Sequence, residues 1–469
     1  MNKYKYLLKN IGILTISNFG TKILSFILIP LYTSVLTTAE YGTYDFYSST
    51  VSLLVPILTL NVVDSVMRFS LDKETDKKQV FSVGFNRFLL SIVILLGLIL
   101  INEFFSVLPL LKLYRGYFIL LYISSVLYNL LSQFCRGMEK ITVVAIAGIL
   151  NSLIMLLMNV FFLVTLKIGL DGYFLAYILS YFLPCIYLFI KIKCWRYISL
   201  VNIDNQIKKE MLTYSKPLIF NTIAWWINNV SDRYIVTWMC GVAANGVYSI
   251  AYKIPSVLNI FQSIFSQAWT LSAVKEFSDD NSDFYSKIYT IYNVLMIMVC
   301  SVLIILDKIM AKILFAKGFY EAWKYAPFLM ISVIFGALSG FLGGIFTAVK
   351  ETSIIAKTTI IGAIVNTVLN LLLVSKFGPI GAAITTLISY VIVWSIRLYA
   401  ANRIVKMNIY LIRDILCYLL LIIQSLILLF LPDLHAVLLN IFFTFLILFI
   451  QKDNVRFVIL KLCRFQKFN

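Results

Sequence analysis

Long apolar segments separated by short polar ones run through nearly the whole chain. A helix needs about 20 apolar residues to cross the hydrocarbon layer of a membrane, and segments of about this length recur along the sequence. They lie at 11–31, 44–67, 88–110, 117–134, 141–165, 172–190, 218–240, 243–268, 288–306, 325–349, 353–374, 380–400, 414–431 and 434–450. The first, seventh and eighth are less apolar than the rest. The pattern predicts an all-α integral membrane protein with about 14 transmembrane helices.

Composition supports a membrane protein and argues against a soluble enzyme. The 469 residues are 61% hydrophobic and 13% charged, with a mean hydropathy of +0.91, whereas soluble domains carry about 25% charged residues. The loops between the expected helices are too short to fold a soluble catalytic domain. The seven scattered cysteines and the single histidine, His435, form no disulfide or zinc pattern. We therefore expect no enzyme activity, no metal site and no cofactor.

The basic residues predict how the chain lies in the membrane. With the N-terminus placed inside, 29 of the 40 lysines and arginines fall on the inner side, 8 on the outer side and 3 within helices. This distribution satisfies the positive-inside rule with both termini cytoplasmic. The net charge of +18 therefore reflects orientation in a cytoplasmic membrane rather than binding to nucleic acid.

Two short motifs recur at a nearly constant spacing and predict an internal repeat. Residues 167–172, KIGLDG, are followed by Ser180-Tyr181, and residues 376–381, KFGPIG, by Ser389-Tyr390, always 209 positions later. A weaker match, GTY at 42–44 against GVY at 246–248, has an offset of 204. Both matches lie at turns before an expected helix.

The repeat predicts two pseudo-symmetric six-helix bundles and a C-terminal hairpin. We expect an N-terminal bundle at 1–205, a second bundle at 206–405, and a two-helix appendage with a cytoplasmic tail at 406–469. Six helices per repeat return the chain to the same side, so the repeats are parallel. Transporters built in this way rock one bundle against the other around a central site. The alternative is that duplication only eased folding.

Four charged residues fall inside expected helices, where each costs about 2.5–3.5 kcal/mol at the centre of the span. They are Lys22 in the first helix, Asp232 and Arg233 in the seventh, and Lys253 in the eighth. Asp232 and Lys253 lie at similar depth on either side of a turn near Gly241, so an ion pair between them is one interpretation. The four together carry a net charge of +2, which would attract an anion such as a pyrophosphate. Alternatively, the cations snorkel to the interface or neutralise buried acids.

A second charged pair, Asp64 and Arg68, lies at the cytoplasmic end of the second helix with a spacing of four residues. An ion pair at the membrane interface is the simpler interpretation. Arg68 could instead contact a lipid headgroup at the inner mouth of a cavity.

Amide and indole side chains accompany the charges in the less apolar helices. They are Asn18, Asn221, Asn228, Asn229, Gln267, Trp225 and Trp226. Amides and aromatic faces suit sugar hydroxyls, but amides also join helices in membranes, and both interpretations remain open. Pro30 and Pro255 should bend the first and eighth helices.

Two segments of the sequence resemble bacterial polysaccharide flippases of the Wzx type. They read NFGTKILSFILIPLYTSVLTTAEYGTYDFYSS, around Lys22, and SDRYIVTWMCGVAANGVYSIAYKIP, around Arg233. The turns of the repeat resemble the same family. The resemblance covers roughly the first twelve helices and implies the fold of the multidrug and oligosaccharide exporter superfamily, with two six-helix bundles around a central cavity.

The resemblance also implies a substrate and partners. Members of this family move undecaprenyl-pyrophosphate-linked oligosaccharides, of O-antigen or capsule type, from the inner to the outer leaflet of the bacterial inner membrane. It implies a cationic cavity that matches Lys22, Arg233 and Lys253, and alternating access coupled to H⁺ or Na⁺. A polysaccharide polymerase and a chain-length regulator are the implied protein partners.

Two other functions compete with the flippase. A multidrug extruder of cationic drugs usually carries an acidic residue in the first helix, where this chain has Lys22 and no acid. A membrane polymerase or glycosyltransferase needs a large outer loop or an acidic nucleotide-sugar site, and neither is visible in the sequence. A passive scaffold for the assembly machinery is a third alternative.

Overall fold

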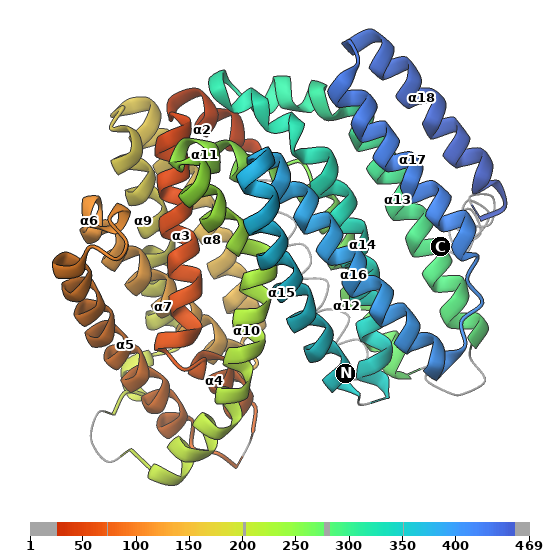
Figure 1. Ribbon diagram of the computed structural model, residues 1–469. Coiled ribbons are helices and arrows are strands. Elements are labelled where there is room, and N and C mark those ends of the chain that lie inside the picture. Colours follow the sequence, from red (N-terminus) through yellow and green to blue (C-terminus); the bar gives the residue numbers. More distant parts are fainter. Residues whose placement is uncertain (1–25, 73, 200–202, 276–281, 350, 455–469) are drawn as a thin grey trace. The chain divides into compact units, whose positions relative to one another are not determined.

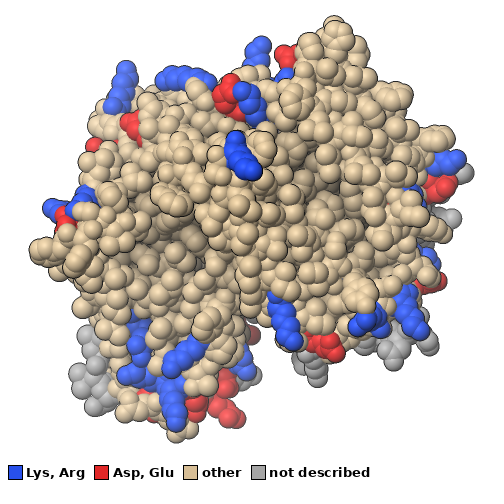
Figure 2. Space-filling model, in the orientation of Figure 1, with Lys and Arg blue, Asp and Glu red and all other residues tan. Residues whose placement is uncertain are grey.

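Helices are the only regular elements in the described part of the chain. The computed structural model describes all residues except 1–25, 73, 200–202, 276–281, 350 and 455–469 (Figure 1). Within the described residues, ten helices are long and apolar enough to cross a membrane, or eleven if one bent pair forms a single span. Figure 2 shows charged side chains gathered toward the helix ends, with uncharged surface between them. This is the surface of a multi-pass membrane protein.

The expected fourteen spans are confirmed only in part. Eleven of them coincide with the ten candidate spans and the bent pair. The remaining three are the less apolar ones. Most of the segment 11–31 lies outside the described residues. The segment 218–240 belongs to α10 (Asn205–Cys240). Because α10 has many polar side chains, it is not among the helices that are apolar enough to count as candidate spans. The segment 243–268 is broken into two helices.

The chain divides into two compact units, Met1–Trp226 and Ile227–Asn469. The first unit holds α2 to α9 and the start of α10. These helices are α2 (Ile29–Val35), α3 (Thr38–Leu58), α4 (Val62–Ser70), α5 (Lys77–Phe105), α6 (Leu110–Leu113), α7 (Arg115–Gly137), α8 (Ile141–Asn159), the π-helix η1 (Val160–Thr165), α9 (Gly169–Lys191) and the short η2 (Cys194–Arg196). α9 packs against both α7 and α8, and α4 packs against α7.

The α3–α4 pair is one bent span whose ends follow from local chemistry. Thr37 and Glu40 form a reciprocal capping box at the start of α3. The helix stops two residues after Pro56, and α4 leaves at an angle of 60°. Leu60 and Asn61 both have positive φ, 53° and 52°, which costs a residue other than glycine roughly 1–2 kcal/mol. Tertiary packing must hold this break in place.

The second unit contains the rest of α10 and all later helices. They are α11 (Val242–Ala251), α12 (Ser256–Lys275), α13 (Ser282–Leu314), the 3₁₀-helix η3 (Lys317–Lys324), α14 (Ala326–Ala348), α15 (Thr352–Phe377), α16 (Pro379–Val405), α17 (Leu411–Phe430) and α18 (Asp433–Ile450). α14 is the most buried span and packs against α12, α13 and α16. The hairpin α17–α18 packs against α13 (Figure 1).

Pro255 explains why the expected eighth span is not continuous. A proline ring clashes with the carbonyl four residues earlier and provides no N–H, and α11 ends at Ala251, four residues before Pro255. The residues between α11 and α12 form turns. The expected bend is therefore a full break. Pro30 instead lies in the first turn of α2, where its missing N–H has no cost.

The repeated motifs place a glycine of positive φ and a tightly packed glycine at matching positions in both units, although Lys167 lies between η1 and α9 with φ of 53° and Lys376 belongs to α15. Gly169 and Gly378 have positive φ, +54° and +65°, and begin or precede α9 and α16. The next glycine of each motif, three residues later, is tightly packed. A Cβ atom on Gly172 would lie 2.8 Å from Phe162 Cβ, and one on Gly381 would lie 2.4 Å from the Leu373 carbonyl oxygen. Each turn needs glycine at both positions. Both motifs thus join two helices of a hairpin, α8–η1–α9 in one unit and α15–α16 in the other, and the internal repeat stays a prediction.

Candidate functional site

Asp232 is the centre of a buried polar cluster in the second unit. Its side chain lies on α10, and the residue is only 1% exposed. The hydroxyls of Tyr248 and Tyr252 each donate to its Oδ2 atom at 2.6 Å, and the Thr386 hydroxyl lies 3.4 Å from the same atom. Three hydroxyl groups from α11, from the turn after it and from α16 therefore converge on one carboxylate. Such donors stabilise its charged form.

Arg233 and Lys253, two of the predicted cations, lie near this cluster in sequence. The guanidinium of Arg233 is half-buried and its Cζ atom lies 5.1 Å from the centroid of the Tyr252 ring, a cation–π arrangement. Lys253 is half-buried in the turn between α11 and α12. Tyr252 thus contacts both Asp232, through its hydroxyl, and Arg233, through its ring.

The expected Asp232–Lys253 ion pair is not formed. Both residues are described, and Asp232 makes its side-chain hydrogen bonds to hydroxyls and to the Arg233 backbone N–H. The break before Pro255 explains the difference. It places Lys253 in a turn rather than on a helix face, whereas Tyr248 and Tyr252, four residues apart, present both hydroxyls to the carboxylate.

The amides of α10 connect this helix to its neighbours. Asn228 Nδ2 donates to the Thr359 carbonyl on α15 at 2.9 Å, and Tyr390 on α16 donates to Asn229 Oδ1 at 2.8 Å. The Ser231 hydroxyl lies 3.4 Å from Asn366 Oδ1. These contacts fit the helix-packing interpretation of the amides. They also fix the face of α10 that carries Asp232.

A second polar pair on α15 extends the cluster. Asn366 and Asn370, both buried, are joined by a hydrogen bond of 3.0 Å from Asn370 Nδ2 to Asn366 Oδ1. Neither was among the predicted site residues. Two asparagines four residues apart in an otherwise apolar helix are a signal that sequence analysis could have used.

Arg397 is a buried cation that the sequence analysis missed. Counted among the cytoplasmic basic residues, it lies inside α16 and is 7% exposed. Its Nε donates to the Thr358 hydroxyl at 2.8 Å, and its terminal nitrogens donate to the Ser339 and Ile355 carbonyls and to the Thr359 hydroxyl at 2.9, 3.2 and 3.0 Å. The guanidinium thereby links α14, α15 and α16. It has no ion pair with a carboxylate in the described part of the chain.

The other predicted site residues lie in the first unit. Trp226 Nε1 donates to the Ser49 carbonyl and the Ser52 hydroxyl on α3 at 3.1 and 3.0 Å, whereas Trp225 is 54% exposed. Asn221 is exposed. Lys22 and Asn18 lie outside the described residues, as does the side chain of Gln267.

Asp64 and Arg68 do not form the expected interface ion pair, although both are described. Asp64 instead accepts hydrogen bonds from Asn61 Nδ2 at 2.9 Å and from Gln133 Nε2 at 3.4 Å. Arg68 is exposed at the end of α4. The carboxylate therefore fastens the α3–α4 break to α7, and the guanidinium is available to solvent or headgroups.

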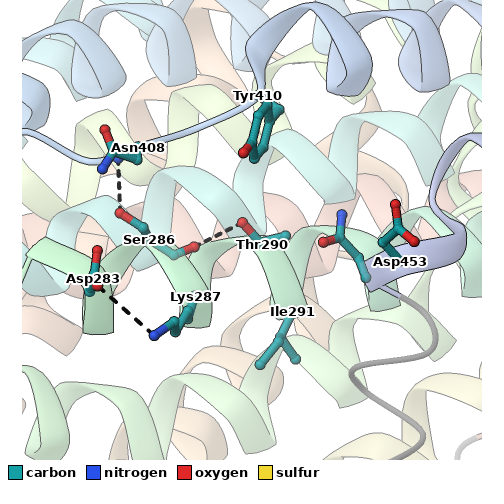
Figure 3. Close-up of a pocket in the computed structure, with 9 residues that line it drawn as sticks. Asp283, Ser286, Lys287, Thr290, Ile291, Asn408, Tyr410 and Asp453 are labelled. Atoms are coloured by element: carbon teal, nitrogen blue, oxygen red, sulfur yellow. Dashed lines mark hydrogen bonds and ion pairs between the residues drawn. The ribbon is translucent and has the colours of Figure 1, made fainter.

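Three hollows among the described residues contain none of the predicted site residues. One of about 360 Å³ lies where the start of α13 meets residues 408–410 and 453–454 (Figure 3). Its wall includes Asp283 and Lys287, 4.0 Å apart, and the Ser286 hydroxyl, which accepts from the Asn408 backbone N–H at 2.9 Å. The hydrogen bond holds the segment before α17 against α13. This hollow is a structural junction.

The arrangement suits ion binding and transport better than catalysis. Among the described residues, no group of three His, Cys, Asp or Glu side chains could hold a metal ion. The Asp232 cluster offers one carboxylate and several hydroxyl and amide oxygens, which can hold a proton or an alkali cation. Arg233 adds a half-buried positive charge beside it. The sequence identified Asp232 and Arg233, but it missed their tyrosine partners because these lie on a segment expected to be a plain span.

Comparison of folds defines the class of protein. The chain is similar to the lipid II flippase MurJ in an inward closed conformation, with 16% identity over 95% of this chain and 99% of that one and a TM-score of 0.71. An inward-facing multidrug resistance transporter of the MATE family, in the MOP superfamily, is similar over 82% of this chain and 96% of that one, with 14% identity and a TM-score of 0.65. Our chain is therefore a multi-pass membrane protein with the fold of these transporters.

Its family is defined by sequence. The model of the polysaccharide biosynthesis protein family matches residues 7–270, more than half of the chain, and the protein belongs to this family. A MOP-superfamily transporter from Pyrococcus furiosus, described as having a binding pocket of reversed polarity, is also similar in fold, with 14% identity over 85% of this chain and 94% of that one and a TM-score of 0.54. No curated protein gives a significant match.

Proposed function

We propose that this protein flips undecaprenyl-pyrophosphate-linked oligosaccharides, of O-antigen or capsule type, across the bacterial cytoplasmic membrane. The observation that carries the proposal is the combination of family and fold. A member of the polysaccharide biosynthesis family shares its fold, over 95% of its length, with a flippase of a lipid-linked precursor. The chain is proposed to work by alternating access between two six-helix bundles, at 1–205 and 206–405, with 406–469 as an appendage.

The proposed substrate contacts are the four cations Lys22, Arg233, Lys253 and Arg68. A diphosphate requires positive charge, and arginine binds phosphate oxygens through paired N–H groups. Support comes from Arg233, which is half-buried beside polar partners, and from Arg68, which is exposed at a helix end. Asn221, Asn228, Asn229, Trp225 and Trp226 are proposed to line the sugar path.

Asp232 is proposed to couple substrate movement to H⁺ or Na⁺. Its carboxylate is buried and bound by hydroxyls rather than by a cation, so an incoming ion can neutralise it without displacing an ion pair. Neutralising it would weaken the hydrogen bonds to Tyr248 and Tyr252 and loosen α11 from α10. Ion binding would thereby bias the conformation of this unit.

The decisive experiment is deletion of the gene in its host. We expect surface glycan to be lost while undecaprenyl-linked repeat units accumulate in the inner leaflet, and normal glycan after deletion would reject the flippase. Complementation with Arg233→Ala or Lys22→Ala should restore less export than wild type, whereas Lys376→Ala, exposed in the last turn of α15, should restore it fully. Full export by the double variant Lys22→Ala/Arg233→Ala would reject the cation site.

Further assays test the competing functions, the orientation of the chain and its proposed partners. A cation-coupled multidrug extruder would expel cationic dyes from cells. Deletion of a polymerase would leave unlinked repeat units on the outer surface, and deletion of a glycosyltransferase would leave incomplete repeat units on the lipid. For orientation, a cysteine introduced at 467 should react with a membrane-impermeant reagent only in broken cells.

Pull-down of a polysaccharide polymerase or a chain-length regulator would test the proposed partners.

A further inference from the structure

A second buried carboxyl group, far along the chain from Asp232, has no role in the mechanism above. Asp307 lies on α13, seven residues before the helix ends at Leu314. Its residue is 0% exposed, and neither Oδ1 nor Oδ2 has a hydrogen-bond partner. A buried polar atom without a partner is rare in folded proteins, and here both oxygens of one carboxyl lack one.

The nearest cation does not neutralise Asp307. Lys308 is its neighbour in sequence, and adjacent residues on a helix point in different directions. Lys308 Nζ is instead 2.7 Å from Asp433 Oδ1 at the start of α18 and 4.3 Å from the centroid of the Trp323 ring on η3. The ammonium group is therefore committed to an outer carboxylate and an aromatic face.

In the described part of the chain, the elements α14, α17, α18 and η3, which pack against α13, bring no other cation into contact with Asp307. α14 contains no charged residue, and the charges of α17, Arg413 and Asp414, lie in its first turn, at the opposite end of the bundle. Besides Trp323, η3 brings Lys317, Tyr320, Glu321 and Lys324, and α18 brings Asp433 and His435. Of these, Asp433 is bound to Lys308 and Glu321 is bound to Lys324.

An ionised carboxylate in this position would be strongly unfavourable, because burial without a partner costs several kcal/mol per ion. A metal cation would need several oxygen ligands, and the described residues contain no cluster of acidic, histidine or cysteine side chains. A proton needs no such ligand set. We propose that Asp307 is a proton-binding site, neutral in the conformation seen here, with η3 as the cover that controls its access to water.

The position of η3 supports its role as the cover. This short helix packs against α11, α13 and α14, and its Phe319 and Ala322 are buried while Tyr320 is only partly buried. Burial raises the pKa of Tyr320, because an ionised phenolate would be poorly hydrated at this place. Trp323 on η3 lies against the Lys308 ammonium, next to Asp307 in the sequence, so η3 reaches the part of α13 that carries the buried acid.

The same helix links Asp307 to Asp232, another buried acid of this unit. η3 packs against α11, and α11 carries Tyr248, whose hydroxyl donates to Asp232. Tyr325, directly after η3, has its ring centroid 6.1 Å from that of Tyr248. A movement of η3 that opened Asp307 to water would therefore also disturb the partners of Asp232. Proton release from Asp307 and ion binding at Asp232 share one mechanical element.

Infrared spectroscopy of the purified full-length protein tests the protonation state directly. At neutral pH we expect a carbonyl stretch of a protonated carboxylic acid that shifts in D₂O. This band should disappear in Asp307→Asn and persist in the matched control Asp283→Asn, an exposed acid on the same helix. Because the buried Asp232 and Asp414 contribute bands of their own when protonated, Asp232→Asn and Asp414→Asn are recorded in parallel. A spectrum of Asp307→Asn with the same protonated-acid intensity as wild type would overturn the proposal.

Two more measurements keep the test independent of folding and of transport. Asp307→Leu should melt at or above the wild-type temperature, because it replaces a neutral acid without partners by an apolar side chain. Melting well below wild type would show stabilising contacts to a charged carboxylate and overturn the proposal.

The transport readout rests on the proposed function. For one coupled proton, the rate at which wild type flips lipid-linked glycan should change by up to about tenfold per pH unit. Asp307→Asn should flatten this dependence of the rate on pH. An unchanged profile would remove Asp307 from coupling. If wild type itself moved no lipid-linked glycan, the flippase would be rejected while the infrared result stood.

Discussion

Arg397 allows a quantitative test of how the second unit is held together. Its guanidinium donates to two hydroxyls and two backbone carbonyls on α14 and α15. Hydrogen bonds between membrane helices contribute about 0.6 kcal/mol on average and at most about 1.7 kcal/mol, so the four bonds together bound the effect at roughly 2–7 kcal/mol. The substitution of Arg397 by an uncharged residue also removes the free-energy cost of burying the charge, which offsets part of this loss. We expect Arg397→Met to lower the free energy of unfolding by about 2–4 kcal/mol.

The measurement is reversible unfolding in mixed micelles, followed by tryptophan fluorescence. Arg397→Lys keeps the charge but loses the planar fork of donors, so its stability should lie between wild type and Arg397→Met. Arg403→Met is the matched control, because Arg403 is exposed on the same helix and its replacement should change stability by less than about 0.5 kcal/mol. If Arg397→Met were as stable as wild type or more stable, the guanidinium would not be a net link between the helices.

Three further variants test individual contacts by the same unfolding measurement. Gly378→Ala should cost about 1–3 kcal/mol, because φ of +65° with ψ of −149° is accessible almost only to glycine. Equal stability would exclude strain at the turn. Gln424→Leu should cost about 1–2 kcal/mol, because Gln424 bonds Ser301, Asn440 and Thr444 and so joins α13, α17 and α18; a gain in stability would contradict this. Trp226→Phe should cost about 0.5–1.5 kcal/mol through loss of the indole hydrogen bonds, and no change would show them to be dispensable.

The long apolar spans were predictable because bilayer thickness imposes one length and one composition on every helix that crosses it. For this reason α5, α8 and α13–α18 all match expected segments. The two glycines of each turn stood out in the sequence because one has positive φ and the other has neighbours closer than a Cβ atom allows.

The polar helices were harder to predict, because their form depends on partners elsewhere in the chain. Counting apolar residues could not show that α10 would use its amides on α15 and α16, or that Pro255 would end α11 completely. Depth along an ideal hairpin suggested Lys253 as the partner of Asp232, and that reasoning failed when the hairpin was not regular. Asp307 and Arg397 were overlooked because each lies near the end of an expected span, where a charge is ordinarily solvated.

The interruption between α3 and α4 has a consequence for how the first unit meets lipid. Acyl chains offer no hydrogen bonds, so an irregular peptide stretch at membrane depth is tolerated only against protein or water. Thr59 and Asn61 are 2% and 8% exposed, and Asp64 fastens the stretch to Gln133 on α7. The kinked side of this span must therefore be turned away from the bilayer, which fixes the rotation of the span about its own axis within the unit.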